Sequence, residues 1–328
     1  MKTFILALIA FTAINGFANK NQSNNLSFVV LSDIHIYTSG KIPAKAKVVI
    51  EHVLNLKPDL IFITGDHTNG NRNDGHQLPK VSTWYNSLEI LLAPLTQAGI
   101  PLFPTVGNHD YYEPAHKKAY DRWAKNVISK SINLLSLGQP NDYLSFMFNY
   151  KNVDFFIFNL WRQNFGEKQK KWVKEFAQNN NKKNLRFGFG HVPLRSTIGR
   201  TSTHFYKTTS TLFEELGLDI YFCGHEHLHW DETNPLTNSF RQTIVGTASG
   251  TYNFPIRRQM AEVHCTNSEC IMPATRKYFQ VKKLSNGAAE QKFKQNWIHV
   301  KVSNGKISTD SYALGSNDEQ VNFYIDSN

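Results

Sequence analysis

Three histidines fall within five positions of the stretch YFCGHEHLHW, residues 221–230, directly after an apolar run. A single histidine at such a place is usually a hydrogen-bonded polar group or a solvated loop residue. His225 and His227, however, stand two positions apart behind a glycine. Because neutral imidazole is the commonest protein ligand for metals, this pair indicates a metal site. We interpret His229 as a residue that supports the ligands or the fold.

Four earlier apolar runs also end in residues that can bind a metal. These residues are Asp33 and His35, then Asp66, then Asn108, His109 and Asp110, and then His191. One such residue alone would read as a helix cap or a turn. Oxygen from Asp and Asn, combined with nitrogen from His, suits borderline divalent metals such as Mn, Fe, Zn or Co. The set is too large for one ion, so we expect two ions that share a carboxylate, an arrangement suited to phosphoryl displacement.

The apolar runs predict the strands that must position these residues. NLSFVVLSDIH, DLIFITGD, IPLFPTVGNHD, NLRFGFGH and LDIYFCGHEH each read as a strand buried on both faces. Helical patterns lie between them, over residues 44–56, 81–97, 114–128, 166–179 and 211–216. This alternation indicates an α/β sheet, in which ligands gather at the carboxyl ends of the strands.

Two further regions read as β-structure. YLSFMFNY and VDFFIFNL are separated by Lys151-Asn152 and predict a hairpin. From Phe240 onward the pattern is mostly β and includes a second hairpin that turns at Asn304-Gly305. We expect these strands to build a second sheet. Because no repeat, low-complexity tract or linker divides the chain, we predict one domain over residues 19–328.

The ordered set of motifs resembles the calcineurin-like metallophosphoesterases. The motifs read DIH (33–35), GD (65–66), GNHD (107–110), GH (190–191) and GHEH (224–227). The glutamine and the tryptophan of LWRQNFGEKQKKWVKEF add to the likeness. The resemblance implies an α/β fold, a four-layer αββα sandwich of two mixed sheets flanked by helices. Purple acid phosphatases use a tyrosine ligand and lack the D-x-H motif, so His35 argues against that branch.

The resemblance also implies a role for each motif residue. The implied ligands are Asp33, His35 and His227 for one metal, Asn108, His191 and His225 for the other, and Asp66 as the bridge. His109 corresponds to the catalytic histidine, which stabilises the phosphoryl group or protonates the leaving oxygen. Asp110 would orient His109. The two cations would lower the pKa of a bridging water, and the resulting hydroxide would attack phosphorus.

The implied function is hydrolysis of phosphate esters, with phosphomonoesters and phosphodiesters as open alternatives. A noncatalytic protein of the same fold that binds anions through its metals is the competing interpretation. Arg195, Arg200 and His204 lie on a polar, threonine-rich segment after His191 and are candidates for contacts with substrate. A solvated surface loop is the other interpretation of that segment.

Composition and charge agree with a soluble globular protein. The chain has 328 residues, of which 41% are hydrophobic and 19% charged, and its formal net charge of +10 favours anionic partners. The basic residues are dispersed and do not alternate with aromatic residues. We therefore expect no dedicated nucleic-acid site.

Residues 1–18 have the layout of a secretory signal peptide, with Lys2 before an apolar run and cleavage after Ala18. That run is shorter than the ~20 residues needed to span a bilayer. We therefore expect an exported protein, periplasmic or secreted, with no transmembrane segment in the mature chain. In an oxidising compartment Cys265 and Cys270 could form a disulfide, whereas Cys223 is predicted to be a buried thiol.

Overall fold

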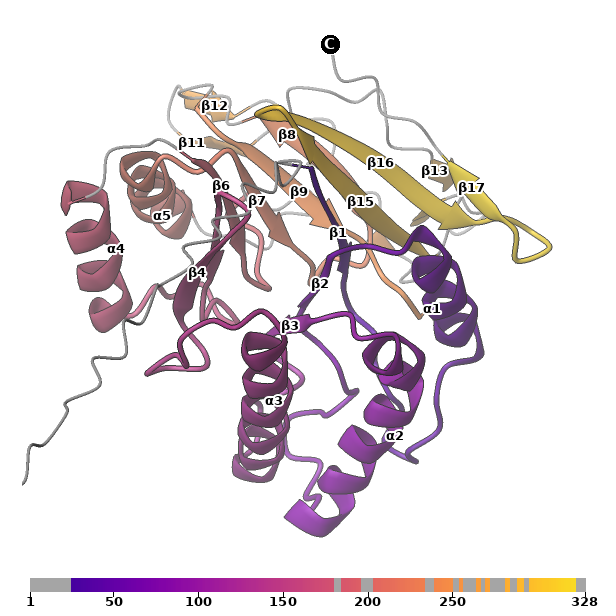
Figure 1. The fold of residues 1–328 in the computed structure, drawn as a ribbon. Coiled ribbons are helices and arrows are strands. Elements are labelled where there is room, and N and C mark those ends of the chain that lie inside the picture. The colour runs from indigo at the N-terminus through magenta and orange to yellow at the C-terminus, as the bar shows by residue number, and fades with distance from the viewer. Residues whose placement is uncertain are drawn as a thin grey trace, which may run out of the picture.

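The fold of the chain was obtained as a computed structural model (Figure 1). It describes residues 25–179, 184–195, 203–233, 239–249 and 295–322, together with the backbone of five short strands between residues 254 and 291. The predicted signal peptide lies outside these residues. Within these ranges, no helix is both long enough and apolar enough to cross a membrane.

The first sheet joins strands from both ends of the chain. In sheet order its strands are β17 (Gln320–Asn322), β16 (Lys306–Leu314), β15 (Asn296–Ser303), β1 (Leu26–Leu31), β2 (Leu60–Thr64) and β3 (Leu102–Thr105). β1, β2 and β3 run parallel, and β15 pairs antiparallel with the other side of β1. β15 and β16 pair directly on either side of Asn304-Gly305, which confirms the predicted C-terminal hairpin.

The second sheet is also mixed and six-stranded. In sheet order its strands are β4 (Phe146–Tyr150), β5 (Val153–Ile157), β6 (Leu185–Phe189), β7 (Ile220–Cys223), β9 (Arg241–Val245) and β8 (His229–Thr233). β4 and β5 form the predicted hairpin around Lys151-Asn152. β5, β6, β7 and β9 run parallel, and β8 closes the edge antiparallel to β9.

Short strands form two small additional pairings. They are β10 (Phe254–Pro255), β11 (His264–Thr266), β12 (Glu269–Ile271), β13 (Val281–Lys283) and β14 (Ala288–Gln291). The backbone register places Cys265 opposite Cys270 in the β11–β12 pair. The side chains of both lie outside the described residues, so their disulfide stays a prediction. Cys223 is fully buried on β7, as predicted.

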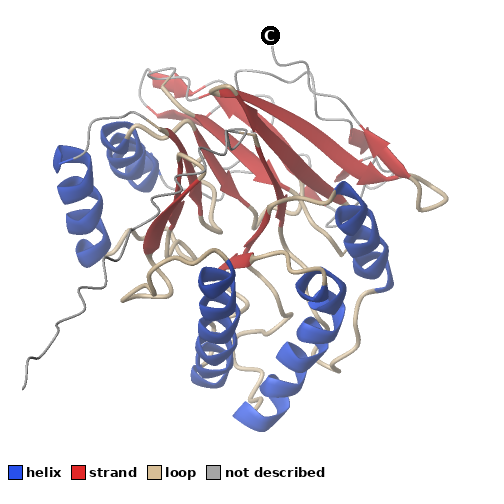
Figure 2. Ribbon diagram, viewed as in Figure 1, coloured by secondary structure: helices blue, strands red, loops and turns tan. Residues whose placement is uncertain are grey.

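Helices cover the outer faces of both sheets (Figure 2). The helices are α1 (Ala44–Leu56), α2 (Leu78–Gln97) and α3 (Pro114–Leu134) on the first sheet, and α4 (Glu167–Asn179) and α5 (Thr203–Leu216) on the second. This arrangement confirms the predicted four-layer αββα sandwich. α1 has the predicted bounds, whereas α3 continues six residues beyond the predicted end at 128 and α5 begins at 203 rather than 211.

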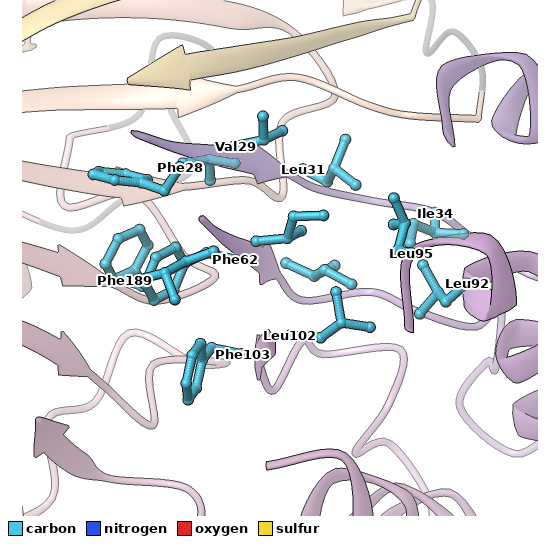
Figure 3. Close-up of a cluster of buried hydrophobic side chains, with 14 of the residues drawn as sticks. Phe28, Val29, Leu31, Ile34, Phe62, Leu92, Leu95, Leu102, Phe103 and Phe189 are labelled. Atoms are coloured by element: carbon cyan, nitrogen blue, oxygen red, sulfur yellow. The ribbon is translucent and has the colours of Figure 1, made fainter. Parts of the chain in front are cut away.

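Aromatic side chains fill the space between the two sheets. The rings of Phe62 on β2 and Phe189 on β6 stack with their centroids 3.8 Å apart, and Phe28 on β1 lies beside them (Figure 3). Along β5, Phe155 packs against Phe28, whereas Phe156 turns outward to Phe176 of α4. Because successive side chains face opposite layers, the central strands carry apolar residues at most positions.

Candidate metal centre

The predicted ligands lie in loops that follow the parallel strands of both sheets. After β1 the chain stays paired with the loop after β2, since Asp33 N donates to the Gly65 carbonyl oxygen at 3.1 Å. His35 N donates likewise to the Asp66 carbonyl oxygen at 3.0 Å. The second sheet joins this edge where His225 N donates to Asp33 Oδ2 at 3.0 Å. The carboxyl ends of strands from both sheets therefore converge on one site.

Many of the predicted ligands have a left-handed backbone. The residues with positive φ are Asp33 (51°), His35 (51°), Asp66 (50°), His225 (71°) and His227 (54°). This region costs a residue with a side chain about 1–2 kcal/mol. Such conformations persist only where the surrounding structure determines them, and they concentrate at functional sites. The strain is therefore consistent with loops shaped to aim side chains.

The first group of ligand atoms surrounds the carboxylate of Asp33. Its Oδ1 lies 3.1 Å from His227 Nε2 and 3.6 Å from His35 Nε2. The two ring nitrogens face each other at 3.0 Å. Asp66 completes the group, with Oδ2 3.8 Å from His35 Nε2. All four ligand atoms lie within 4.8 Å of one another, which is the spacing of a cation cage.

The second group shares the carboxylate of Asp66. His191 Nε2 lies 3.2 Å from Asp66 Oδ2 and 2.9 Å from Asn108 Oδ1. His225 Nδ1 lies 3.2 Å from His191 Nε2. The structure thus brings all the predicted ligands together as two adjoining groups with Asp66 in both, the division that the motif resemblance implies.

Backbone and side-chain partners orient the ligands of the second group. His191 Nδ1 lies 2.8 Å from the Thr64 carbonyl oxygen. Because a carbonyl only accepts, Nδ1 carries the hydrogen and Nε2 is left as the ligand atom. Asn108 Nδ2 donates to the Tyr112 hydroxyl, which leaves the amide oxygen to face His191. Sequence reasoning did not identify Tyr112, although it follows directly after the GNHD motif and Tyr111.

The site concentrates opposite charges. Burial works to raise the pKa of the Asp33 carboxyl, but neighbouring His227 holds that pKa well below its usual range. Burial also opposes ionisation of Asp66, whose pKa is nevertheless lowered by His191. Burial works to lower the pKa of His191, and the Asp66 carboxylate raises that pKa to about 9. Both carboxylates are therefore anionic at neutral pH, as ligands of a cation must be.

His109 lies where the sequence places it, whereas Asp110 has other partners than expected. His109 lies at the site, with Nε2 3.9 Å from Asp66 Oδ2, but its Nδ1 lies 2.6 Å from the Gly70 carbonyl oxygen. The prediction that Asp110 orients His109 is therefore wrong. The fully buried Asp110 carboxylate instead accepts from the backbone nitrogens of His67 and Gly107 and from His67 Nδ1 and the Tyr85 hydroxyl. It ties the loops after β2 and β3 together.

The backbone angle and close contacts at Gly65 explain why a glycine precedes Asp66. Its φ is +90°, and an added Cβ would lie 2.5 Å from His191 Nδ1 and 2.8 Å from the Gly107 Cα. Any side chain would therefore both strain the backbone and push His191 away. The glycine lets the loops after β2, β3 and β6 approach closely enough to share Asp66.

The three residues suggested for substrate contacts have different outcomes. Arg195 is buried, its backbone nitrogen and oxygen bind the Gln242 side chain, and burial lowers its pKa to about 10. His204 is exposed on α5, because this helix packs against the core through the buried Phe205 and Tyr206. That part of the segment is a helix rather than the expected loop. Arg200 lies outside the described residues.

Comparison with known proteins points to one family. The family described as calcineurin-like phosphoesterase matches residues 26–229. No curated protein matches the chain. Among solved structures, GAP50, the anchor in the inner membrane complex of Plasmodium, matches with a TM-score of 0.55 and 15% identity, over 92% of this chain and 90% of that one. Purple acid phosphatase PPD1 from yellow lupin (Lupinus luteus) seeds matches with a TM-score of 0.55 and 11% identity, over 92% of this chain and 53% of that one. At such low identity, these two likenesses bear on the fold.

Proposed function

Because this chain belongs to the calcineurin-like phosphoesterase family, we propose that it hydrolyses phosphate esters with two divalent cations. The observation that carries the proposal is the position of the Asp66 carboxylate. Its Oδ2 lies 3.8 Å from His35 Nε2 in one group of ligand atoms and 3.2 Å from His191 Nε2 in the other. A buried carboxylate between two sets of imidazoles is suited to bridge two ions.

The residues present fit such ions in type and in arrangement. Asp33, His35 and His227 would hold one ion, and Asn108, His191 and His225 the other, with Asp66 between them. This mixture of oxygen and nitrogen atoms suits Mn, Fe, Zn or Co. When bound, two such ions would polarise the phosphoryl group and make water acidic enough to serve as the nucleophile.

His109 gives the chain a group that can move a proton. Its ring is partly exposed, and Nδ1–H is held by the Gly70 carbonyl oxygen. Nε2 is the ring atom turned toward the site, so a proton on it could pass to the leaving oxygen. A noncatalytic protein that binds anions through the same metals would need no such donor. The orientation of His109 therefore favours catalysis over binding alone.

A reconstitution assay tests the proposed function. The full chain is stripped of metal, then loaded with Mn²⁺, Zn²⁺, Co²⁺ or Fe²⁺ and assayed on 4-nitrophenyl phosphate and bis(4-nitrophenyl) phosphate. We expect hydrolysis of at least one ester that rises with metal content up to two ions per chain. Protein that holds two ions yet hydrolyses neither ester would favour the anion-binding alternative.

We also propose export of the mature chain from near Asn19, supported by the short apolar run before Gly16 and Ala18. N-terminal sequencing of protein recovered from the medium or the periplasm of an expressing bacterium tests this. Retention of residues 1–18 in the recovered protein would contradict it.

A further inference from the structure

A cavity of about 200 Å³ opens beside the candidate metal centre. Asn108 and His225, two of the proposed metal ligands, contribute to its lining. Two arginines, Arg72 and Arg162, line the same cavity from different loops. Arg72 lies in the loop after β2, and Arg162 lies in the loop between β5 and α4. Two permanent positive charges thus meet at the place where a substrate would reach the metals.

Both guanidinium groups lie over aromatic rings that also line the cavity. Arg72 Cζ lies 5.1 Å from the centre of the Tyr112 ring, and Arg162 Cζ lies 3.8 Å from the Trp161 ring. Stacking uses the flat face of a guanidinium and leaves its N–H groups free to bind an anion in the plane. These ring contacts favour side-chain positions beside the cavity for both exposed arginines.

The supporting rings are themselves held in place. The Tyr112 hydroxyl accepts from Asn108 Nδ2, and the Tyr112 ring contacts the ring of His109 at 5.1 Å between centroids. The Trp161 ring packs against Tyr111 at 5.3 Å. Among the residues that the structure describes, no carboxylate forms an ion pair with either arginine. An anionic ligand would supply the missing countercharge.

We propose that Arg72 and Arg162 form a clamp that makes this site prefer phosphomonoesters to phosphodiesters. The inference rests on the proposed function and adds its substrate class. A phosphomonoester carries close to two negative charges at neutral pH and has three free oxygens for charge-assisted hydrogen bonds. A diester carries one charge and has only two such oxygens. The two guanidinium groups beside the metals should therefore bind a monoester more tightly than a diester.

The neighbouring surface has room for an organic group of the substrate. A second cavity, of about 760 Å³, shares Trp161 and Arg162 with the first and continues to Phe146 and Trp172. A leaving alcohol could lie there while the phosphoryl group stays between Arg72 and the proposed ligands.

Matched substrates and variants test the clamp. Arg72→Gln and Arg162→Gln are compared with the wild-type protein on 4-nitrophenyl phosphate and methyl 4-nitrophenyl phosphate, which release the same alcohol. We expect each variant to lose about 10- to 100-fold in kcat/KM on the monoester, the effect of one charge-assisted contact. The diester should lose less than about threefold. Arg122→Gln, at an exposed arginine of α3 that does not line the cavity, is the matched control and should change neither.

Binding gives a readout that does not depend on turnover. Calorimetric titration of the metal-loaded proteins with inorganic phosphate should show affinity at least about tenfold weaker in both cavity variants, with metal content and Tm unchanged. Equal losses on the two esters, or unchanged phosphate binding, would overturn the clamp. Absence of hydrolysis in every protein would instead contradict the proposed function, and phosphate binding would still decide whether the arginines hold an anion.

Discussion

The Nδ1 atom of His109 lies 2.6 Å from the carbonyl oxygen of Gly70. The catalytic candidate is thus held by the backbone of the loop that also carries Asp66. Since a carbonyl only accepts, Nδ1 keeps its hydrogen, which leaves Nε2 as the atom for the proposed proton transfer. The loop after β2 therefore positions both the shared carboxylate of Asp66 and the proposed acid His109.

His109→Ala should slow turnover without releasing the metals. Loss of a general acid costs about 10²–10⁴ in rate. The loss should be smaller for esters with good leaving groups, which need little protonation. Metal content and kcat on a poor and a good leaving group are the measurements. Near-normal turnover on both esters would reject the role of His109.

Asp66→Asn should weaken both metal sites together. The amide removes the negative charge that the two groups of ligand atoms share, so metal content and activity should fall in parallel. Elemental analysis of the purified variant gives the number of ions per chain. Asp310→Asn removes a carboxylate that pairs with exposed Lys301 and is the control, which should retain both ions. A variant at Asp66 that still held two tightly bound ions would exclude the bridging role.

Gly65→Ala should damage the fold and the site at once. The left-handed backbone and the contact with His191 together should cost about 2–4 kcal/mol in the free energy of unfolding. Gly99→Ala is the control, because Gly99 also has a positive φ (+72°) but an added Cβ meets no atom within 4 Å. That variant should lose only about 1–2 kcal/mol and keep its metals. Equal effects in denaturant unfolding would show that crowding of His191 is unimportant.

His299→Leu should make stability less sensitive to acid. Burial on β15, aided by Lys301 and opposed by Asp310, lowers the pKa of His299 to about 4. The unfolded chain binds a proton near pH 6.5, so acidification from 6.5 to 4 favours unfolding of the wild-type protein. Unfolding free energies at pH 7 and 4.5 should differ by about 1–2 kcal/mol less in the variant, with the effect limited by solvent screening near Lys301. His204→Leu, at an exposed histidine, should retain the wild-type difference.

The central parallel strands were predictable because their sequences are nearly continuous apolar runs. β2 reads LIFIT and is buried throughout, as a central strand between two layers must be. The start of α5, by contrast, could not be predicted from its sequence pattern. Its first turns are rich in threonine, a weak helix former, and the helix there depends on tertiary packing that includes the buried Phe205 and Tyr206.

The candidate site was predictable only in part, for a related reason. The ligands stand at strand ends in short motifs, so pattern and resemblance locate them. Asp110 stands in a motif too, but its partners come from the loop after β2 and from α2, which sequence spacing cannot reveal. Arg72 and Arg162 are exposed loop residues far apart in the chain. Only the fold brings them to one cavity.

The pairing of β15 with β1 links the earliest described strand to one of the last. While the chain is being synthesised, β1 already has β2 as a neighbour on one side, but its other side stays open until residue 303 has left the ribosome. That open edge is the apolar segment LSFVVL, which is prone to pair with other chains. A nascent or truncated chain that stops before Asn296 is therefore expected to aggregate or to require a chaperone, even though every proposed metal ligand has by then been made.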